Sequence, residues 1–172
     1  MITYSINKLN PDELESIAQN MVNADKWKAE HGYNPEDMHL GLLGETAYGL
    51  YTNQKVNKTV YKGGDGGNDF IADDCKVNVK TRRIKDNWFE LPDLILDRKN
   101  INKSDKYVLA LYSRVSNDIT VVGEISNDSF TDAMVKFQRG KPEEYMVHIS
   151  DLDKLYETTI QDLEEKYNKK CK

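Results

Sequence analysis

The spacing of apolar residues changes once along this chain, and that change constrains the fold more than any other feature. Up to about residue 56 apolar side chains recur every three or four residues, as on one face of a helix. From about residue 57 they alternate with polar ones, in short runs separated by Gly, Asp, Asn and Ser. Helices followed by strands predict an α/β or α+β class with a mixed or antiparallel sheet of about five strands.

Two Asn–Pro pairs predict where the first two helices begin. Asn10 and Pro11, with Glu13 three residues after the asparagine, are typical of a capping box, and Asn34 with Pro35 begins a more apolar helix. Strands are expected at 57–62, 68–72, 75–83, 106–113 and 119–126. Further expected elements are a short helix after Pro92, a helix at 129–138, a strand at 144–150 and a charged C-terminal helix at 151–170.

Composition limits the class of protein. A chain of 172 residues with 38% apolar content predicts a single domain over residues 1–172. It has no run long enough to span a bilayer and no signal-peptide pattern at its start, so we expect a soluble, cytoplasmic protein without membrane partners. Cys75 and Cys171 are expected to be free thiols. Abundant Lys, Asn and Ile suggest a microbial or viral, AT-rich genome.

A polar face is expected on one hairpin. If residues 73–74 form a two-residue turn, the register sets Asp69 opposite Asn78. Because side chains alternate along a strand, Lys80 shares the face of Asn78. From periodicity alone, a solvated outer face of the hairpin is the simpler explanation of these polar residues.

Glu45 lies in a helix that is apolar on two sides. A carboxylate there is costly to bury unless a cation or hydrogen bonds compensate it. Gly41, Gly44 and Gly49 remove bulk around it, which would let the helix approach a sheet or ligand closely. Alternatively, Glu45 lies at the rim of the core and reaches water.

The segments GLLGETAYGLY, GGDGGNDF and VNVKT, in this order, resemble the motifs of the PD-(D/E)XK nuclease superfamily. The resemblance covers roughly residues 36–126 and implies a restriction-endonuclease-like fold, with helices flanking the central mixed sheet. It implies that Glu45 and Asp69 bind a metal ion, Mg²⁺ or Mn²⁺ as its substitute. Lys80 corresponds to the lysine that assists the attacking water, and DNA is the implied substrate. Small members often work as dimers, so a homodimer is one expected assembly.

Asn78 departs from the family pattern, which has an acidic residue in this third metal-ligand position. A carboxamide offers a metal ion one neutral oxygen and no charge, so weaker metal binding is expected. Three explanations remain open: a natural variant with weak or no catalysis, an Asp-to-Asn change made to trap substrate, or an acid supplied from elsewhere. An acid-x-Lys triplet also occurs at Asp74–Lys76, where the acid is more simply part of the turn.

A cluster of positive charge lies between residues 76 and 85, in an otherwise acidic chain with a net charge of −5. Such a cluster suits a phosphate backbone, although lysines also protect sheet edges from pairing. The glycine-rich turn before Asp69 would let the backbone approach a phosphate. Residues expected to contact DNA are Lys76, Arg82, Arg83 and Lys85, beside the catalytic Lys80.

The leading hypothesis is a magnesium-dependent DNA endonuclease of restriction or resolvase-like type, with Glu45, Asp69, Asn78 and Lys80 as its catalytic residues. The alternative is a non-catalytic DNA-binding protein that retains the fold and has lost turnover through Asn78. A third hypothesis is an α+β protein in which Glu45 and Asp69 only make structural hydrogen bonds.

Overall fold

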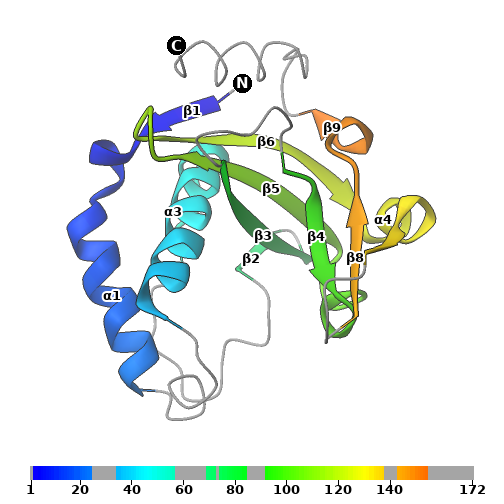
Figure 1. The fold of residues 1–172 in the computed structure, drawn as a ribbon, viewed down its shortest axis with the longest axis horizontal. Helices are drawn as coiled ribbons and strands as arrows, with labels where there is room; N and C mark the ends of the chain where they lie inside the picture. Colours follow the sequence, from blue (N-terminus) through cyan, green and yellow to red (C-terminus); the bar gives the residue numbers. More distant parts are fainter. Residues whose placement is uncertain are drawn as a thin grey trace.

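The computed structural model describes residues 2–24, 34–56, 69–72, 74–84, 92–137 and 143–154. These residues form a mixed α+β structure with two sheets (Figure 1). The helices are α1 (Pro11–Ala24), α3 (Pro35–Thr52) and α4 (Asn127–Ala133), with 3-10 turns η1 (Ile6–Leu9), η2 (Arg98–Asn100) and η3 (Ile149–Asp151). The strands are β1 (Ile2–Ser5), β2 (Phe70–Ala72), β3 (Cys75–Ile84), β4 (Leu94–Asp97), β5 (Lys106–Ser113), β6 (Asp118–Ser126), β7 (Val135–Phe137), β8 (Glu144–Val147) and β9 (Asp153–Lys154).

The larger sheet is mixed and has the strand order β1-β6-β5-β3-β2, with β9 also paired to β6. Strands β3 and β5 are parallel, while the other pairs in this sheet are antiparallel. The β2–β3 hairpin has the expected register, with Ala72 opposite Cys75, and Asp74 adopts φ 63° in the turn. A left-handed conformation at this position matches an Asp-containing hairpin turn.

Helices α1 and α3 cover one face of the larger sheet (Figure 1). The expected cap of α3 is confirmed, because Asn34 Oδ1 accepts a hydrogen bond from the backbone N–H of Asp37 at 2.8 Å. Close approach of α3 to the sheet depends on Gly44, where an added Cβ would overlap Oγ1 of Thr81. The same Cβ would lie 3.4 Å from that of Ala110 on β5.

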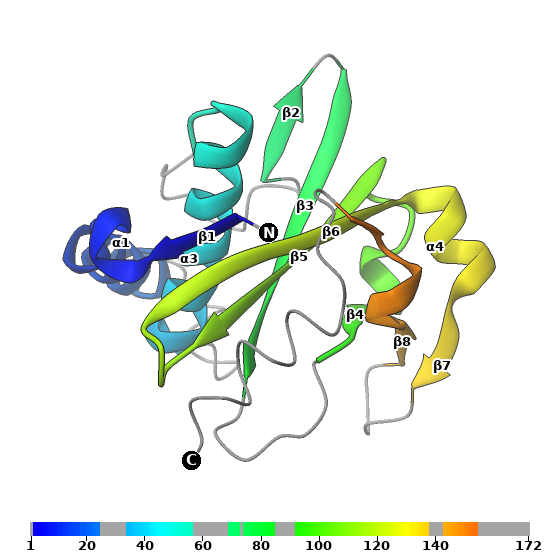
Figure 2. The ribbon, with the colours of Figure 1, turned by 90° about the horizontal axis from the view of Figure 1, so that it is seen from above.

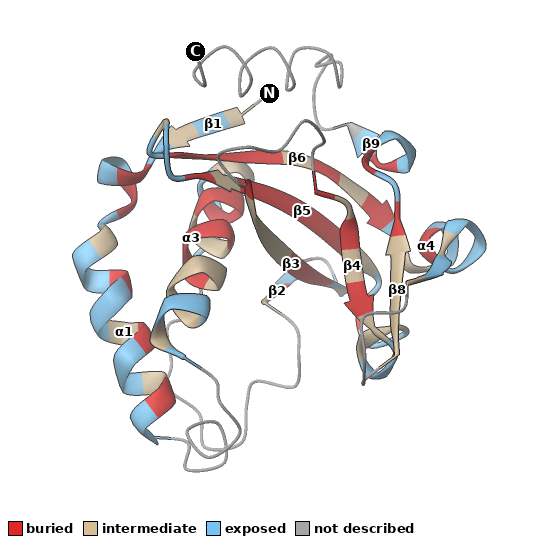
Figure 3. Cartoon of the chain, in the orientation of Figure 1, coloured by how far each residue is buried: buried red, intermediate tan, exposed pale blue. Residues whose placement is uncertain are grey.

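The other face of the larger sheet is covered by the small sheet β4-β8-β7 and by α4 (Figures 1 and 2). Tyr107 and Leu109 of β5 pack there against Leu96 of β4, Phe130 of α4 and Val147 of β8. Buried residues therefore lie on both faces of β5 (Figure 3). The nearly continuous apolar run of β5, KYVLALYS, is typical of a strand that is covered on both faces.

The structure differs from the sequence expectations at several elements. The segment after Pro92 first forms strand β4, which was not expected, and the short helix expected there is a three-residue 3-10 helix, Arg98–Asn100. The helix expected at 129–138 ends at Ala133 and is followed by strand β7. The N-terminal strand β1 was not anticipated. The strand expected at 57–62 and most of the C-terminal helix at 151–170 lie outside the described residues, and Asp153–Lys154 form a short strand.

Among the described residues, none of the helices combines the length and the apolar character that crossing a membrane requires. Cys75 is a free, half-buried thiol, as expected, and Cys171 lies outside the described residues.

Candidate functional site

Asp69 lies where β2 separates from β3. Its backbone N–H donates to the carbonyl oxygen of Val77 at 2.9 Å, and its Oδ2 accepts a hydrogen bond from the backbone N–H of Val79 at 2.6 Å. The carboxylate thus satisfies a backbone donor on the outer edge of β3, just past the paired segment. Extending the register by one residue from the Phe70–Val77 pair sets Asp69 opposite Asn78.

Asn78 and Lys80 project from the face of the larger sheet that is turned away from α3. Val77 and Val79 pack into the cluster under α3, and alternate side chains of a strand point to opposite faces. In the parallel register Asn78 lies beside Tyr107, which belongs to the cluster on the other face. Asn78 is only 6% exposed and Lys80 is half-buried, so neither is part of a fully solvated face.

Glu45 comes from the opposite side of the sheet, on α3. Its Oε1 lies near Gly41, 3.8 Å from where a Cβ would stand. Tyr48, about 4.5 Å further along the helix axis, packs edge-on against Phe70 with ring centroids 5.3 Å apart. Phe70 directly follows Asp69, so the Tyr48–Phe70 contact brings the second half of α3 next to the start of β2. Glu45 therefore belongs to the helix that covers the Val77–Val79 face of β3, whereas Asn78 and Lys80 lie on the other face.

The candidate metal ligands are two carboxylates and one amide. Oxygen ligands of this kind suit Mg²⁺ or Mn²⁺, but Asn78 contributes no charge. Oδ2 of Asp69 also accepts the hydrogen bond from the backbone N–H of Val79. In the part of the chain that the structure describes, no group of three or more His, Cys, Asp or Glu side chains is placed to hold a metal ion. Asp69 and Asn78, which lie opposite one another at the edge of β3, are the residues that would hold such an ion there.

The positive charges of β3 lie on both faces of the strand. Lys76 and Arg82 share the face of Lys80, whereas Arg83 points to the α3 side. There the Arg83 guanidinium donates to Oε1 of Glu36 at 2.7 Å. The expected DNA-contacting residues therefore do not form one continuous patch within the described strand. Lys85, like the glycine-rich turn before Asp69, lies outside the described residues.

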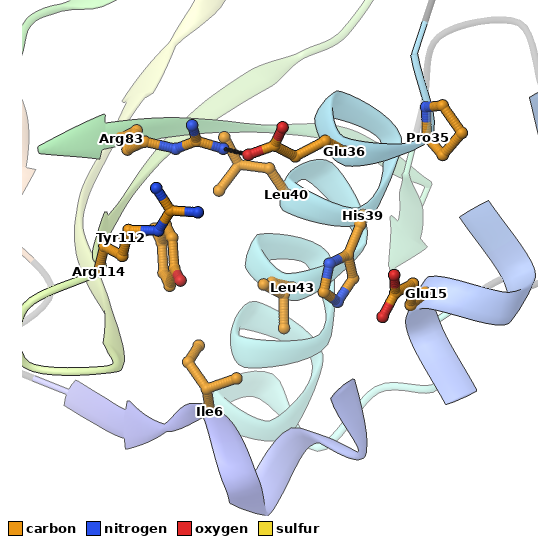
Figure 4. Close-up of a pocket in the computed structure, with 10 residues that line it drawn as sticks. All are labelled: Ile6, Glu15, Pro35, Glu36, His39, Leu40, Leu43, Arg83, Tyr112 and Arg114. Atoms are coloured by element: carbon orange, nitrogen blue, oxygen red, sulfur yellow. Dashed lines mark hydrogen bonds and ion pairs between the residues drawn. The ribbon is translucent and has the colours of Figure 1, made fainter. Parts of the chain in front are cut away.

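A pocket of 470 Å³ was not anticipated from the sequence. It lies among α1, α3 and the carboxyl ends of β3 and β5 (Figure 4). A signal for it existed: the side chains of Arg82 and Arg83 must point to opposite faces, so one arginine had to face whatever covers the sheet. The lining residues are Ile6, Glu15, Pro35, Glu36, His39, Leu40, Leu43, Arg83, Tyr112 and Arg114.

Comparisons of the chain with protein-family models, with curated proteins and with solved structures gave no match. Its function therefore has to be inferred from its own residues and from their arrangement at the edge of β3.

Proposed function

We propose that this chain is a metal-dependent DNA endonuclease with a restriction-endonuclease-like fold, centred on the outer edge of β3. The observation that carries the proposal is the position of Asp69, opposite Asn78 at the point where β2 leaves β3, with Lys80 next on the same face as Asn78. An acid, an amide and a lysine at a strand separation form a compact group of oxygen ligands with an adjacent cation.

Each residue has a distinct proposed role. Asp69 and Asn78 would hold the metal ion, and Glu45 would complete its ligands from α3. A divalent ion at this position, when bound, lowers the pKa of a bound water and offsets charge at the phosphate. Lys80 would orient that water and stabilise the developing negative charge, for which a compact ammonium is suited. Lys76 and Arg82, on the same face of β3, would contact the DNA backbone.

Asn78 determines how much activity to expect. Its amide supplies one neutral oxygen, so the chain is expected to bind the ion weakly and to cleave slowly. A DNA-binding protein without turnover is the second candidate, and it is favoured by the burial of Asn78 at 6% exposure and by the presence of only two carboxylates in the donor set.

Nicking of supercoiled DNA in Mg²⁺ and in Mn²⁺ tests the proposal. The purified chain, its Asn78→Asp variant and the Asn78→Asp/Lys80→Ala double variant should be compared, with a DNA-binding measurement for each. We expect slow nicking by the chain, faster nicking by Asn78→Asp and loss in the double variant, which serves as the control for contaminating nuclease. Binding without nicking by any of the proteins would support the non-catalytic candidate. Absence of both binding and nicking would refute the nucleic-acid function.

A further inference from the structure

The pocket at the amino end of α3 is separate from the proposed metal site. Arg83 lies five residues beyond Asn78 on β3, which corresponds to about 17 Å along an extended strand. The two side chains also point to opposite faces of the sheet. A ligand in the pocket would therefore not contact Asn78 or Lys80, and the pocket needs its own explanation.

The lining of the pocket is divided into an apolar floor and a charged rim. Leu40 and Leu43 of α3 form the floor together with Ile6, and Tyr112 of β5 forms one wall (Figure 4). The guanidinium groups of Arg83 and Arg114 lie on the strand side of the same opening. A volume of 470 Å³ is within the range of small-molecule sites.

Several hydrogen-bond donors at the rim of the pocket are weakly paired or unpaired within the described part of the protein. Arg83 pairs with Glu36, but both side chains are substantially exposed, at 37% and 62%, and such pairs are weak. Arg114 is exposed and makes no ion pair with another described residue. Within the described part of the protein, Nε of Arg83 and Nε2 of His39 are buried atoms that have no hydrogen-bond partner. Buried polar atoms usually have partners, so a side-chain rearrangement that provides them would be favourable.

The amino end of α3 adds to the positive potential. The helix spans 18 residues, and Pro35 and Glu36 in its first turn line the pocket. Unpaired N–H groups and the helix dipole favour an anion near such an end. Glu36, in the first turn of α3, places a carboxylate from the chain itself at this end.

We propose that this pocket binds a small organic phosphate or carboxylate with an apolar body. The anionic group is held between Arg83 and Arg114, for which guanidinium groups have the matching planar geometry. The apolar body lies on Leu40 and Leu43. Glu36 leaves Arg83 when the ligand enters, so it acts as a competitor for the same guanidinium group.

A small molecule fits the pocket better than a DNA strand does. The apolar floor has no use in binding a phosphate backbone, which requires an extended row of cations. Glu15 and Glu36 also line the opening and would repel a long polyanion, whereas a compact anion needs to approach only the arginines.

Binding should be measured by calorimetry and by amide chemical shifts with four probes: phenyl phosphate, benzoate, inorganic phosphate and phenol. A short DNA duplex serves as the macromolecular comparison. We expect phenyl phosphate or benzoate to bind at least tenfold more tightly than inorganic phosphate or phenol, because only they combine charge with an apolar body. Shifts should be confined to the start of α3 and the ends of β3 and β5.

Three variants test the assigned residues. Arg83→Gln and Arg114→Gln should each weaken phenyl phosphate binding about tenfold or more, and Glu36→Gln should tighten it. Arg98→Gln, an exposed and ion-paired arginine of η2, is the matched control and should change nothing. Saturable binding that is insensitive to all three pocket variants, absence of saturable binding by any probe, or binding of the duplex alone would overturn the proposal. Glu36→Gln alters an exposed surface residue, so its result stands even if an arginine variant fails to fold.

Discussion

Oδ2 of Asp69 accepts a hydrogen bond from the backbone N–H of Val79 at 2.6 Å, just beyond the last residue of β3 that pairs with β2. The carboxylate therefore continues the edge of the sheet where the partner strand ends. This hydrogen bond gives Asp69 a structural role. A role in metal binding would be additional to it.

Replacing Asp69 should separate these two roles. Asp69→Ala removes the acceptor and leaves the N–H of Val79 without it, so a loss of about 1–2 kcal/mol in the free energy of unfolding is expected. Asp69→Asn keeps an acceptor oxygen and should lose less. Urea unfolding measures the free energy of unfolding of both variants. If both variants lose the same amount, the acceptor oxygen at this position contributes little to stability.

A side chain at Gly44 should destabilise the protein, because an added Cβ would overlap Thr81 Oγ1. Gly44→Ala has to move α3 from the sheet or displace Thr81, and we expect destabilisation of about 1–3 kcal/mol. Gly41→Ala is the matched control in the same helix, with only an ordinary 3.8 Å contact to Glu45. It should be neutral or stabilise by up to about 1 kcal/mol, since alanine favours helix. In thermal unfolding, the Tm of Gly44→Ala should lie below that of the unmodified chain, and the Tm of Gly41→Ala should equal or exceed it.

The Asn78→Asp variant should bind a divalent ion measurably. Without metal, burial beside Asp69 should raise the pKa of the introduced carboxyl. A carboxyl whose pKa is raised in the folded state stabilises less as pH increases, so the variant should be least impaired below about pH 4 and most impaired at neutral pH.

Addition of Mg²⁺ at neutral pH should raise the Tm of this variant more than that of the unmodified chain. Adding Asp69→Asn to the variant should abolish that difference. A Tm independent of Mg²⁺ in every protein would argue against the metal site without any reference to nuclease activity.

Tyr48 should make the protein sensitive to alkali. Burial between α3 and the sheet, assisted by the negative charge of Glu124, raises the pKa of its hydroxyl to about 12. The unfolded chain ionises near pH 10, so stability is retained below about pH 10 and is lost between about pH 10 and 12.

The slope of this loss is at most about 1.4 kcal/mol per pH unit for one group. Tyr48→Phe removes the ionisation and should show a shallower loss. Urea unfolding at pH 8, 10 and 11 measures the slopes, to which the raised pKa values of Tyr107 and Lys106 contribute in both proteins. Parallel curves for the two proteins would contradict the assignment.

Local rules sufficed for the hairpin and for the start of α3. The paired aspartates before Cys75 set the register, and Asn34 followed by Pro35 set the helix boundary, because turn and cap chemistry acts over a few residues. β4 was missed since a four-residue strand has too little alternation to outweigh a proline that also suits a helix start. Strand alternation alone predicts that the side chains of Arg82 and Arg83 point to opposite faces of the sheet. Which of these two faces α3 covers depends on tertiary packing, so the local sequence did not predict it.

The outer edge of β6 is completed from distant parts of the chain. β1 pairs with it at Asp118–Val121, and Thr3 hydrogen-bonds Thr120 across 117 positions of sequence. β9 adds to the same edge at Gly123, where a Cβ would lie 2.9 Å from the carbonyl oxygen of Asp153. A nascent chain emerging from the ribosome holds its first strand long before the recipient strand exists. Removal of residues 2–5 would expose the hydrogen-bonding groups of β6 to other molecules and favour aggregation.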